Sequence, residues 1–201
     1  MARQSISSGR RKKIQKSKVL ESITGNDALS ILNVLAMRDS AIAKMIDEVA
    51  LEIFRGVNAD EVADQVQSEL EFLQVEDVWD RSGSTRNGYI DPGDAAWEMF
   101  EEALKPFRDE AEKYRCLAMF KEADLCLKGI LKGIYDFDRK SSTEYKDWAV
   151  DAPGEYFGLI LDDWKKLHKG RQAIDDMRKF IEKNCPDWID WALKSLRSRK
   201  R

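Results

Sequence analysis

The sequence predicts an all-α protein of seven to eight helices, and three observations lead to that expectation. Apolar residues recur at three- and four-residue spacing through most of the chain, which is the period of a helix with one buried face. Only 4 Pro and 11 Gly occur in 201 residues, too few for a turn-rich β architecture. Charged residues make up 35% of the chain, above the usual level of about 25%, which suits amphipathic helices with solvated outer faces.

The first three helices are predicted from the residues that cap their starts. Thr24 or Asn26 begins one helix, and Asp39 or Ser40 begins the next. Asn58 begins the third. Each of these side chains can accept a hydrogen bond from an amide of the first turn that has no partner within the helix.

The middle of the chain is expected to contain a long helix with a proline inside it. Residues 75–79 either extend the third helix or form a short helical turn. Asp91 followed by Pro92 begins the next helix, because proline at the first helical position loses no hydrogen bond. Pro106 is expected to kink or divide that helix. No segment has the alternating pattern of a convincing strand.

Two glycines in the following helix predict close packing. That helix follows a tight turn at 117–120, and Gly129 and Gly133 lie four residues apart within it. Glycine costs about 1 kcal/mol relative to alanine inside a helix, so the pair indicates that another backbone passes close by. Three more helices follow, the first beginning at Asp151 and the last two meeting at 185–186.

The arrangement of these helices has two possible forms. Antiparallel helix pairs joined by short turns recur along the chain. They predict either an irregular bundle or a degenerate helical repeat similar to tetratricopeptide (TPR) or HEAT units. The full 34-residue tetratricopeptide signature does not recur, and no fixed period is found.

Charge divides the chain into an acidic body and two basic ends. Residues 1–18 carry a charge of +7 and residues 194–201 carry +5. Because the net charge of the whole chain is −3, residues 19–193 carry −15. We therefore expect a flexible basic arm over 1–18, a helical domain over 19–193 and a basic tail over 194–201. Such ends can bind nucleic-acid phosphates, solubilise the chain or fold onto its acidic body. The candidate nucleic-acid contacts are Arg10, Arg11, Lys12, Lys13, Arg197, Arg199, Lys200 and Arg201.

Two long polar segments, 80–90 and 138–148, are the best local candidates for a site. Both combine basic and hydroxyl side chains beside tryptophan, and long loops often carry function. If the intervening helices return antiparallel, both segments lie at one end of the domain. The alternative is that the arginines of the first segment pair with neighbouring helices. The candidate partner- or anion-binding residues are Trp79, Arg81, Ser82, Ser84, Thr85, Arg86, Tyr89, Tyr145 and Trp148.

The chain carries little that indicates catalysis, a cofactor or a metal site. Its only histidine, His168, cannot supply the paired ligands of a zinc or di-iron site, and no CxxC motif occurs. We therefore expect no catalytic residues, no cofactor and no bound metal. Three cysteines, an odd number, suit a reducing compartment, and neither a signal peptide nor a membrane span is visible. Cytoplasmic location and no contact with membranes are expected.

Three blocks of the sequence carry a resemblance to known proteins. They are residues 78–89 (VWDRSGSTRNGY), 128–135 (KGILKGIY) and 144–149 (EYKDWA). The blocks resemble an uncharacterised family of archaeal and bacterial helical proteins. More distantly, residues 28–168 are similar to the helical region that accompanies SWIM-type zinc fingers, although the zinc finger itself is absent. The resemblance implies a helical-repeat scaffold and transfers no functional residue.

These observations favour a non-enzymatic helical scaffold that binds a protein partner. The last helix supports this prediction, because Trp188 and Trp191 belong to an apolar set spread around much of its circumference. Some of that surface is expected to meet a partner or a second copy in a homodimer. The alternative is a nucleic-acid- or ribosome-associated factor that binds through its basic termini.

Overall fold

The computed structural model describes residues 21–86 and 88–197, and within them the chain is all-α. Nine α-helices, two short 3-10 helices and one small hairpin are present in the described residues. The chain divides into two compact units, Met1–Ile53 and Phe54–Arg201. The domain expected over 19–193 therefore includes parts of both units. Within the described residues, no helix has the length and apolar character needed to cross a membrane.

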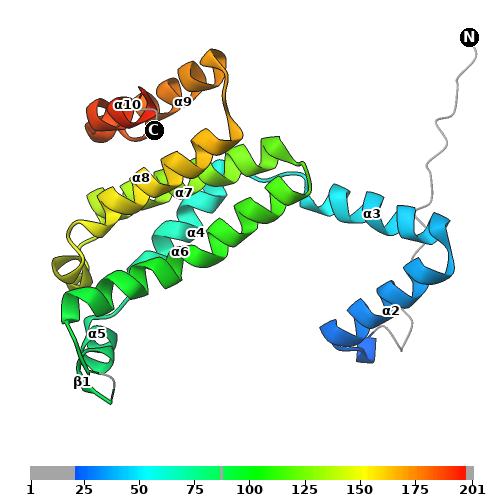
Figure 1. The fold of residues 1–201 in the computed structure, drawn as a ribbon, viewed down its shortest axis with the longest axis horizontal. Helices are drawn as coiled ribbons and strands as arrows, with labels where there is room; N and C mark the ends of the chain where they lie inside the picture. The colour runs from blue at the N-terminus through cyan, green and yellow to red at the C-terminus, as the bar shows by residue number, and fades with distance from the viewer. Residues whose placement is uncertain (1–20, 87, 198–201) are drawn as a thin grey trace, which may run out of the picture. The chain divides into compact units, whose positions relative to one another are not determined.

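The described part of the first unit contains two helices, α2 (Gly25–Arg38) and most of α3 (Ser40–Phe54) (Figure 1). Thr24 caps α2, and it was one of the two residues predicted to begin this helix. The Thr24 hydroxyl oxygen accepts from the Asp27 amide at 3.3 Å, and the Asp27 carboxylate accepts from the Thr24 amide at 3.0 Å. Asp39 alone separates the two helices, and its carboxylate accepts from the Ala41 amide at 2.8 Å.

The second unit begins with two helices and a hairpin that the sequence analysis did not predict. Helix α4 (Ala59–Glu71) is capped by Asn58, and α5 (Val75–Arg81) is a separate short helix. Strands β1 (Gly83–Thr85) and β2 (Gly88–Ile90) pair antiparallel, with Gly83 opposite Ile90. The prediction of no strand was therefore wrong. Gly83 and Gly88 have φ of 93° and 129°, a backbone conformation that favours glycine at tight hairpin turns.

Three long helices form the body of the second unit: α6 (Pro92–Cys116), α7 (Phe120–Lys140) and α8 (Ala152–Leu167). Helix α7 packs against α4, α6 and α8, and Figure 1 shows these helices side by side. Pro106 lies inside α6 without dividing it, so of the two predicted outcomes the structure excludes division of the helix. The remaining elements are η1 (Glu144–Trp148), α9 (Arg171–Asn184), η2 (Pro186–Trp188) and α10 (Ile189–Arg197).

The close approach predicted from the two glycines of α7 is confirmed, and the neighbour is α4. A Cβ added to Gly129 would lie 2.5 Å from the Val62 Cβ and 2.8 Å from the carbonyl oxygen of Ala59. A Cβ on Gly133 would lie 2.6 Å from the Val66 Cβ. Because real Cβ atoms do not approach other atoms so closely, only glycine permits this packing. The two helices are thus in backbone contact at the centre of the core.

Candidate functional site

Trp79 and Trp148 bring together the two polar segments, which the sequence analysis expected at one end of the domain if the intervening helices return antiparallel. Their ring centroids lie 4.6 Å apart and the rings meet edge to face at 74°. Trp79 comes from α5 and Trp148 from η1, 69 residues later in the chain. The Trp79 side chain is 51% exposed, so part of this aromatic pair lies at the surface.

Arg81 holds α5 against α6. Its guanidinium donates to the Glu102 carboxylate at 2.6 Å, and this hydrogen bond raises the pKa of Arg81 further above its ordinary value. The Ser82 hydroxyl donates to the Trp79 carbonyl oxygen at 3.3 Å. Both contacts are made to other residues of the same chain. The ion pair of Arg81 is the alternative that the sequence analysis raised, in which an arginine of this segment pairs with a neighbouring helix. An anion bound here would compete with Glu102 for Arg81.

The remaining residues of the predicted site differ in their accessibility. Ser84, Arg86 and Tyr89 are exposed on or beside the hairpin, whereas Thr85 lies in β1 with a side chain outside the described set. Tyr145 was expected on the polar face but is only 1% exposed, and its hydroxyl donates to the carbonyl oxygen of Ala96. A tyrosine within a polar segment can bury its ring when its hydroxyl finds an internal acceptor. Tyr145 therefore links η1 to α6 and does not reach a partner.

The predicted nucleic-acid contacts fall mostly outside the described residues. Arg197 ends α10, and its side chain is not among those described. The other candidates lie within 1–20 or 198–201, outside the described part of the chain: Arg10, Arg11, Lys12, Lys13, Arg199, Lys200 and Arg201. Their role in binding stays a prediction.

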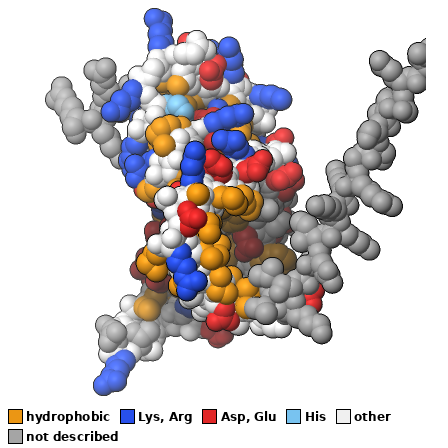
Figure 2. All heavy atoms as spheres, turned by 90° about the vertical axis from the view of Figure 1, so that its right-hand side faces the viewer, with side chains coloured by type: hydrophobic (Ala, Val, Ile, Leu, Met, Phe, Trp, Pro, Cys, Tyr) orange, Lys and Arg blue, Asp and Glu red, His pale blue; other side chains and the backbone are white. Residues whose placement is uncertain are grey.

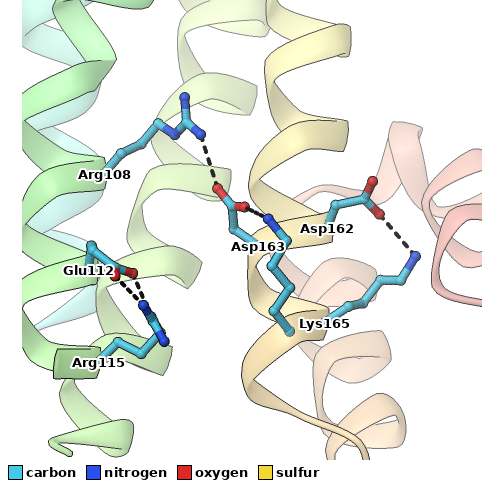
Figure 3. Close-up of polar contacts among 7 residues, drawn as sticks. Arg108, Glu112, Arg115, Asp162, Asp163 and Lys165 are labelled. Carbon is cyan, nitrogen blue, oxygen red and sulfur yellow. Dashed lines mark hydrogen bonds and ion pairs between the residues drawn. The ribbon is translucent and has the colours of Figure 1, made fainter. Parts of the chain in front are cut away.

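A charged groove of about 690 Å³ runs between α6 and α8 (Figure 3). Arg108 of α6 donates to Asp163 of α8 at 3.2 Å, and Lys166 donates to the same carboxylate at 2.6 Å. Glu112 and Arg115 pair with each other on α6. Because acidic and basic side chains alternate here and pair with one another, the groove has no single sign of charge to attract a ligand. One of its pairs, Arg108 with Asp163, instead joins α6 to α8.

Two of the three cysteines are buried. Burial raises the pKa of the Cys126 thiol to about 12, and it raises the pKa of the Cys185 thiol to about 12 as well. Cys116 is exposed at the end of α6. Since the thiolate is the nucleophilic form, the two buried thiols are chemically quiet near neutral pH.

We expect iodoacetamide at pH 8 to alkylate Cys116 at least about 100-fold faster than Cys126 or Cys185 in the folded chain. Four pH units below its pKa, about one thiol in ten thousand is ionised, and burial further blocks the reagent. Mass spectrometry of timed samples measures the three rates. In 8 M urea the three rates should converge. Equal rates in the native chain would contradict the buried positions.

Helices α2 and α3 carry an apolar surface that the described residues of their own unit leave exposed. Neither helix contains a buried residue. Eight large apolar side chains are 41–79% exposed: Leu29, Ile31, Leu32, Val34, Met37, Met45, Val49 and Ile53. Figure 2 shows apolar side chains reaching the surface between charged ones on the face drawn. The sequence analysis predicted both helices from their caps and from the spacing of apolar residues. That their apolar faces are exposed within their own unit can be seen only in the structure.

Comparisons with known proteins give no match: no protein-family model, curated protein or solved structure matches the chain. The resemblance to the uncharacterised helical family, and more distantly to the region beside SWIM-type zinc fingers, stays a prediction.

Proposed function

We propose that the chain is a protein-interaction module that pairs with a second copy of itself through the apolar surface of α2 and α3. The observation that carries this proposal is the absence of any buried residue in either helix, together with eight exposed large apolar side chains. Large apolar side chains exposed in this number on a folded chain mark a site of association. Covering it would remove the side chains from water, at about 25 cal/mol per Å² of apolar surface buried.

The lengths of the two helices support the need for a partner. Helix α2 has 14 residues and α3 has 15. Isolated helices of this length are marginal in water, because nucleation is costly and most helix stability in proteins comes from packing. Packing an apolar face against another chain supplies the free energy that these two helices lack by themselves.

The pattern of charge along α3 favours a second copy as the occupant. Met45, Val49 and Ile53 are spaced four residues apart, so they form one stripe along the helix. At 100° per residue, Lys44 and Asp47 fall on a different side, whereas Glu52 falls beside Met45 at the edge of the stripe. When two copies meet through the stripe, as in a symmetric dimer, Lys44 and Asp47 stay in water and Glu52 lies at the polar rim of the interface.

We expect the chain to form a dimer that Val49→Glu weakens at least about tenfold, because the glutamate would be desolvated in an apolar interface. Sedimentation equilibrium over a range of concentrations measures the dissociation constant. Leu159→Glu, at an exposed position of α8, is the matched control and should leave it unchanged.

Two results would overturn the proposal. One is a monomer at 100 µM whose α2 and α3 amides are nevertheless protected from hydrogen exchange, since the helices would then be covered within one chain. The other is a dimer that Val49→Glu and Leu159→Glu affect equally, since its interface would then lie elsewhere.

A second candidate function rests on the charge segregation of the chain. The +7 of residues 1–18 and the +5 of residues 194–201 would bind nucleic-acid phosphates with salt-dependent affinity. A chain lacking residues 1–18 and 199–201 keeps every described helix and loses ten of these charges. If RNA and DNA bind through the ends, this truncation abolishes binding and flattens its dependence on salt. Unchanged affinity would eliminate this function.

We also propose that the chain works in the cytosol. All three cysteines are free thiols. Free thiols persist in reducing compartments, where glutathione and thioredoxin keep them reduced. Targeted imaging of the tagged chain in its own cells tests the location.

A further inference from the structure

Three tryptophans and three carboxylates line one hollow of about 610 Å³ in the second unit. The aromatic walls come from three elements: Trp97 from α6, Trp188 from η2 and Trp191 from α10. The acidic side chains are Asp138, Asp151 and Glu155. Val150 and Gly154 complete the lining. This hollow shares no residue with the proposed dimer surface or with the charged groove between α6 and α8.

The aromatic walls are held in place by their own packing. Trp188 is only 8% exposed and meets Phe157 edge to face, with ring centroids 5.0 Å apart. Trp191 lies 5.4 Å from the same phenylalanine ring. Trp97 packs on Tyr156, with centroids 5.9 Å apart. The rings therefore need little ordering when a ligand enters, which preserves the free energy of binding.

The carboxylates give the hollow a negative charge that the fold leaves largely unneutralised. Asp138 lies 3.5 Å from the guanidinium of Arg139. Asp151 occupies the N-cap position of α8, yet its carboxylate makes no capping hydrogen bond. Among the described residues, neither Asp151 nor Glu155 forms an ion pair. None of the residues that line the hollow is basic.

We propose that this hollow binds a weakly hydrated organic cation, an alkylammonium or guanidinium group. Such cations are attracted to the π-faces of tryptophan, and carboxylates at the same site add direct charge attraction. An anion is repelled by the three acids. Small inorganic cations hold their water too tightly to exchange it for an aromatic wall.

The six tryptophans provide an internal control for the test. We expect titration with tetramethylammonium chloride to shift the indole N–H signals of Trp97, Trp188 and Trp191 in a saturable way, with a dissociation constant of about 1 mM. The signals of the other three, Trp79, Trp148 and Trp164, should stay in place. Sodium chloride at the same concentrations controls for ionic strength. No saturable shift, or the same shift with sodium, would overturn the proposal.

Variants separate binding in the hollow from general charge effects. Asp151→Asn with Glu155→Gln should weaken binding about tenfold, since both carboxylates lose their charge. Asp64→Asn with Glu69→Gln on α4 removes the same charge at exposed positions and should leave the affinity unchanged. Equal effects of the two pairs would contradict a local site.

Gly154 offers a variant that fills the hollow. A Cβ added at Gly154 meets no atom within 4 Å, so Gly154→Leu should fold normally and abolish binding by occupying the space. Full binding by this variant would overturn the proposal.

Discussion

Replacing Gly129 or Gly133 of α7 by alanine is expected to lower the free energy of unfolding by about 2 kcal/mol each, and replacing both by about 4 kcal/mol. The new methyl group at Gly129 would lie 2.5 Å from the Val62 Cβ and 2.8 Å from the carbonyl oxygen of Ala59. Neither atom is the end of a flexible side chain, so α4 and α7 must separate. That cost exceeds the gain of about 1 kcal/mol that alanine brings to a helix.

Urea unfolding followed by circular dichroism measures this difference. Gly154→Ala in α8 is the matched control, because its added Cβ meets no atom within 4 Å. There alanine should be neutral or stabilise the chain by up to about 1 kcal/mol, since only the backbone preference changes. If Gly129→Ala were as well tolerated as Gly154→Ala, α4 and α7 would not be in backbone contact.

The glycine pair illustrates what could be predicted from the sequence and what could not. Gly129 and Gly133 indicate a close neighbour, because glycine destabilises a helix interior relative to alanine and only close packing compensates for that loss. Their spacing says nothing about which helix approaches, because that depends on contacts between residues more than 60 positions apart. Caps such as Asn58 and Asp91 were predictable for the opposite reason, since they bond to amides two residues away.

The candidate sites also contain features that the sequence could predict and features that it could not. Trp79 and Trp148 were expected to share one end of the domain only if the intervening helices return antiparallel. The short hairpin was missed although Asn87-Gly88 is a strong hairpin signal, because three-residue strands carry too little alternation to recognise. The hollow of Trp97, Trp188 and Trp191 had no local signal at all, since its walls come from elements about 90 residues apart.

Replacing Asp124 of α7 by alanine is expected to lower the free energy of unfolding by about 3 kcal/mol. The Asp124 carboxylate accepts from the Trp164 indole N–H at 2.6 Å and pairs with Lys128 at 2.7 Å. Trp164 is almost fully buried in α8, and its ring stacks on His168 with centroids 4.4 Å apart. Without Asp124 the indole N–H would be buried without an acceptor, which costs more than the bond itself contributes.

Asp124→Asn separates the hydrogen bond from the charge. Its amide oxygen can still accept from Trp164, so this variant should lose only the charge on the side chain that contacts Lys128 and His168, about 1 kcal/mol. Asp109→Ala provides the exposed control: its ion pair with Lys105 is equally short at 2.6 Å but lies in water, and its loss should be barely measurable. Thermal unfolding of the three variants ranks their losses in the free energy of unfolding. Equal losses for Asp124→Ala and Asp124→Asn would mean that the indole bond adds nothing, and α7 and α8 would then be joined by apolar packing alone.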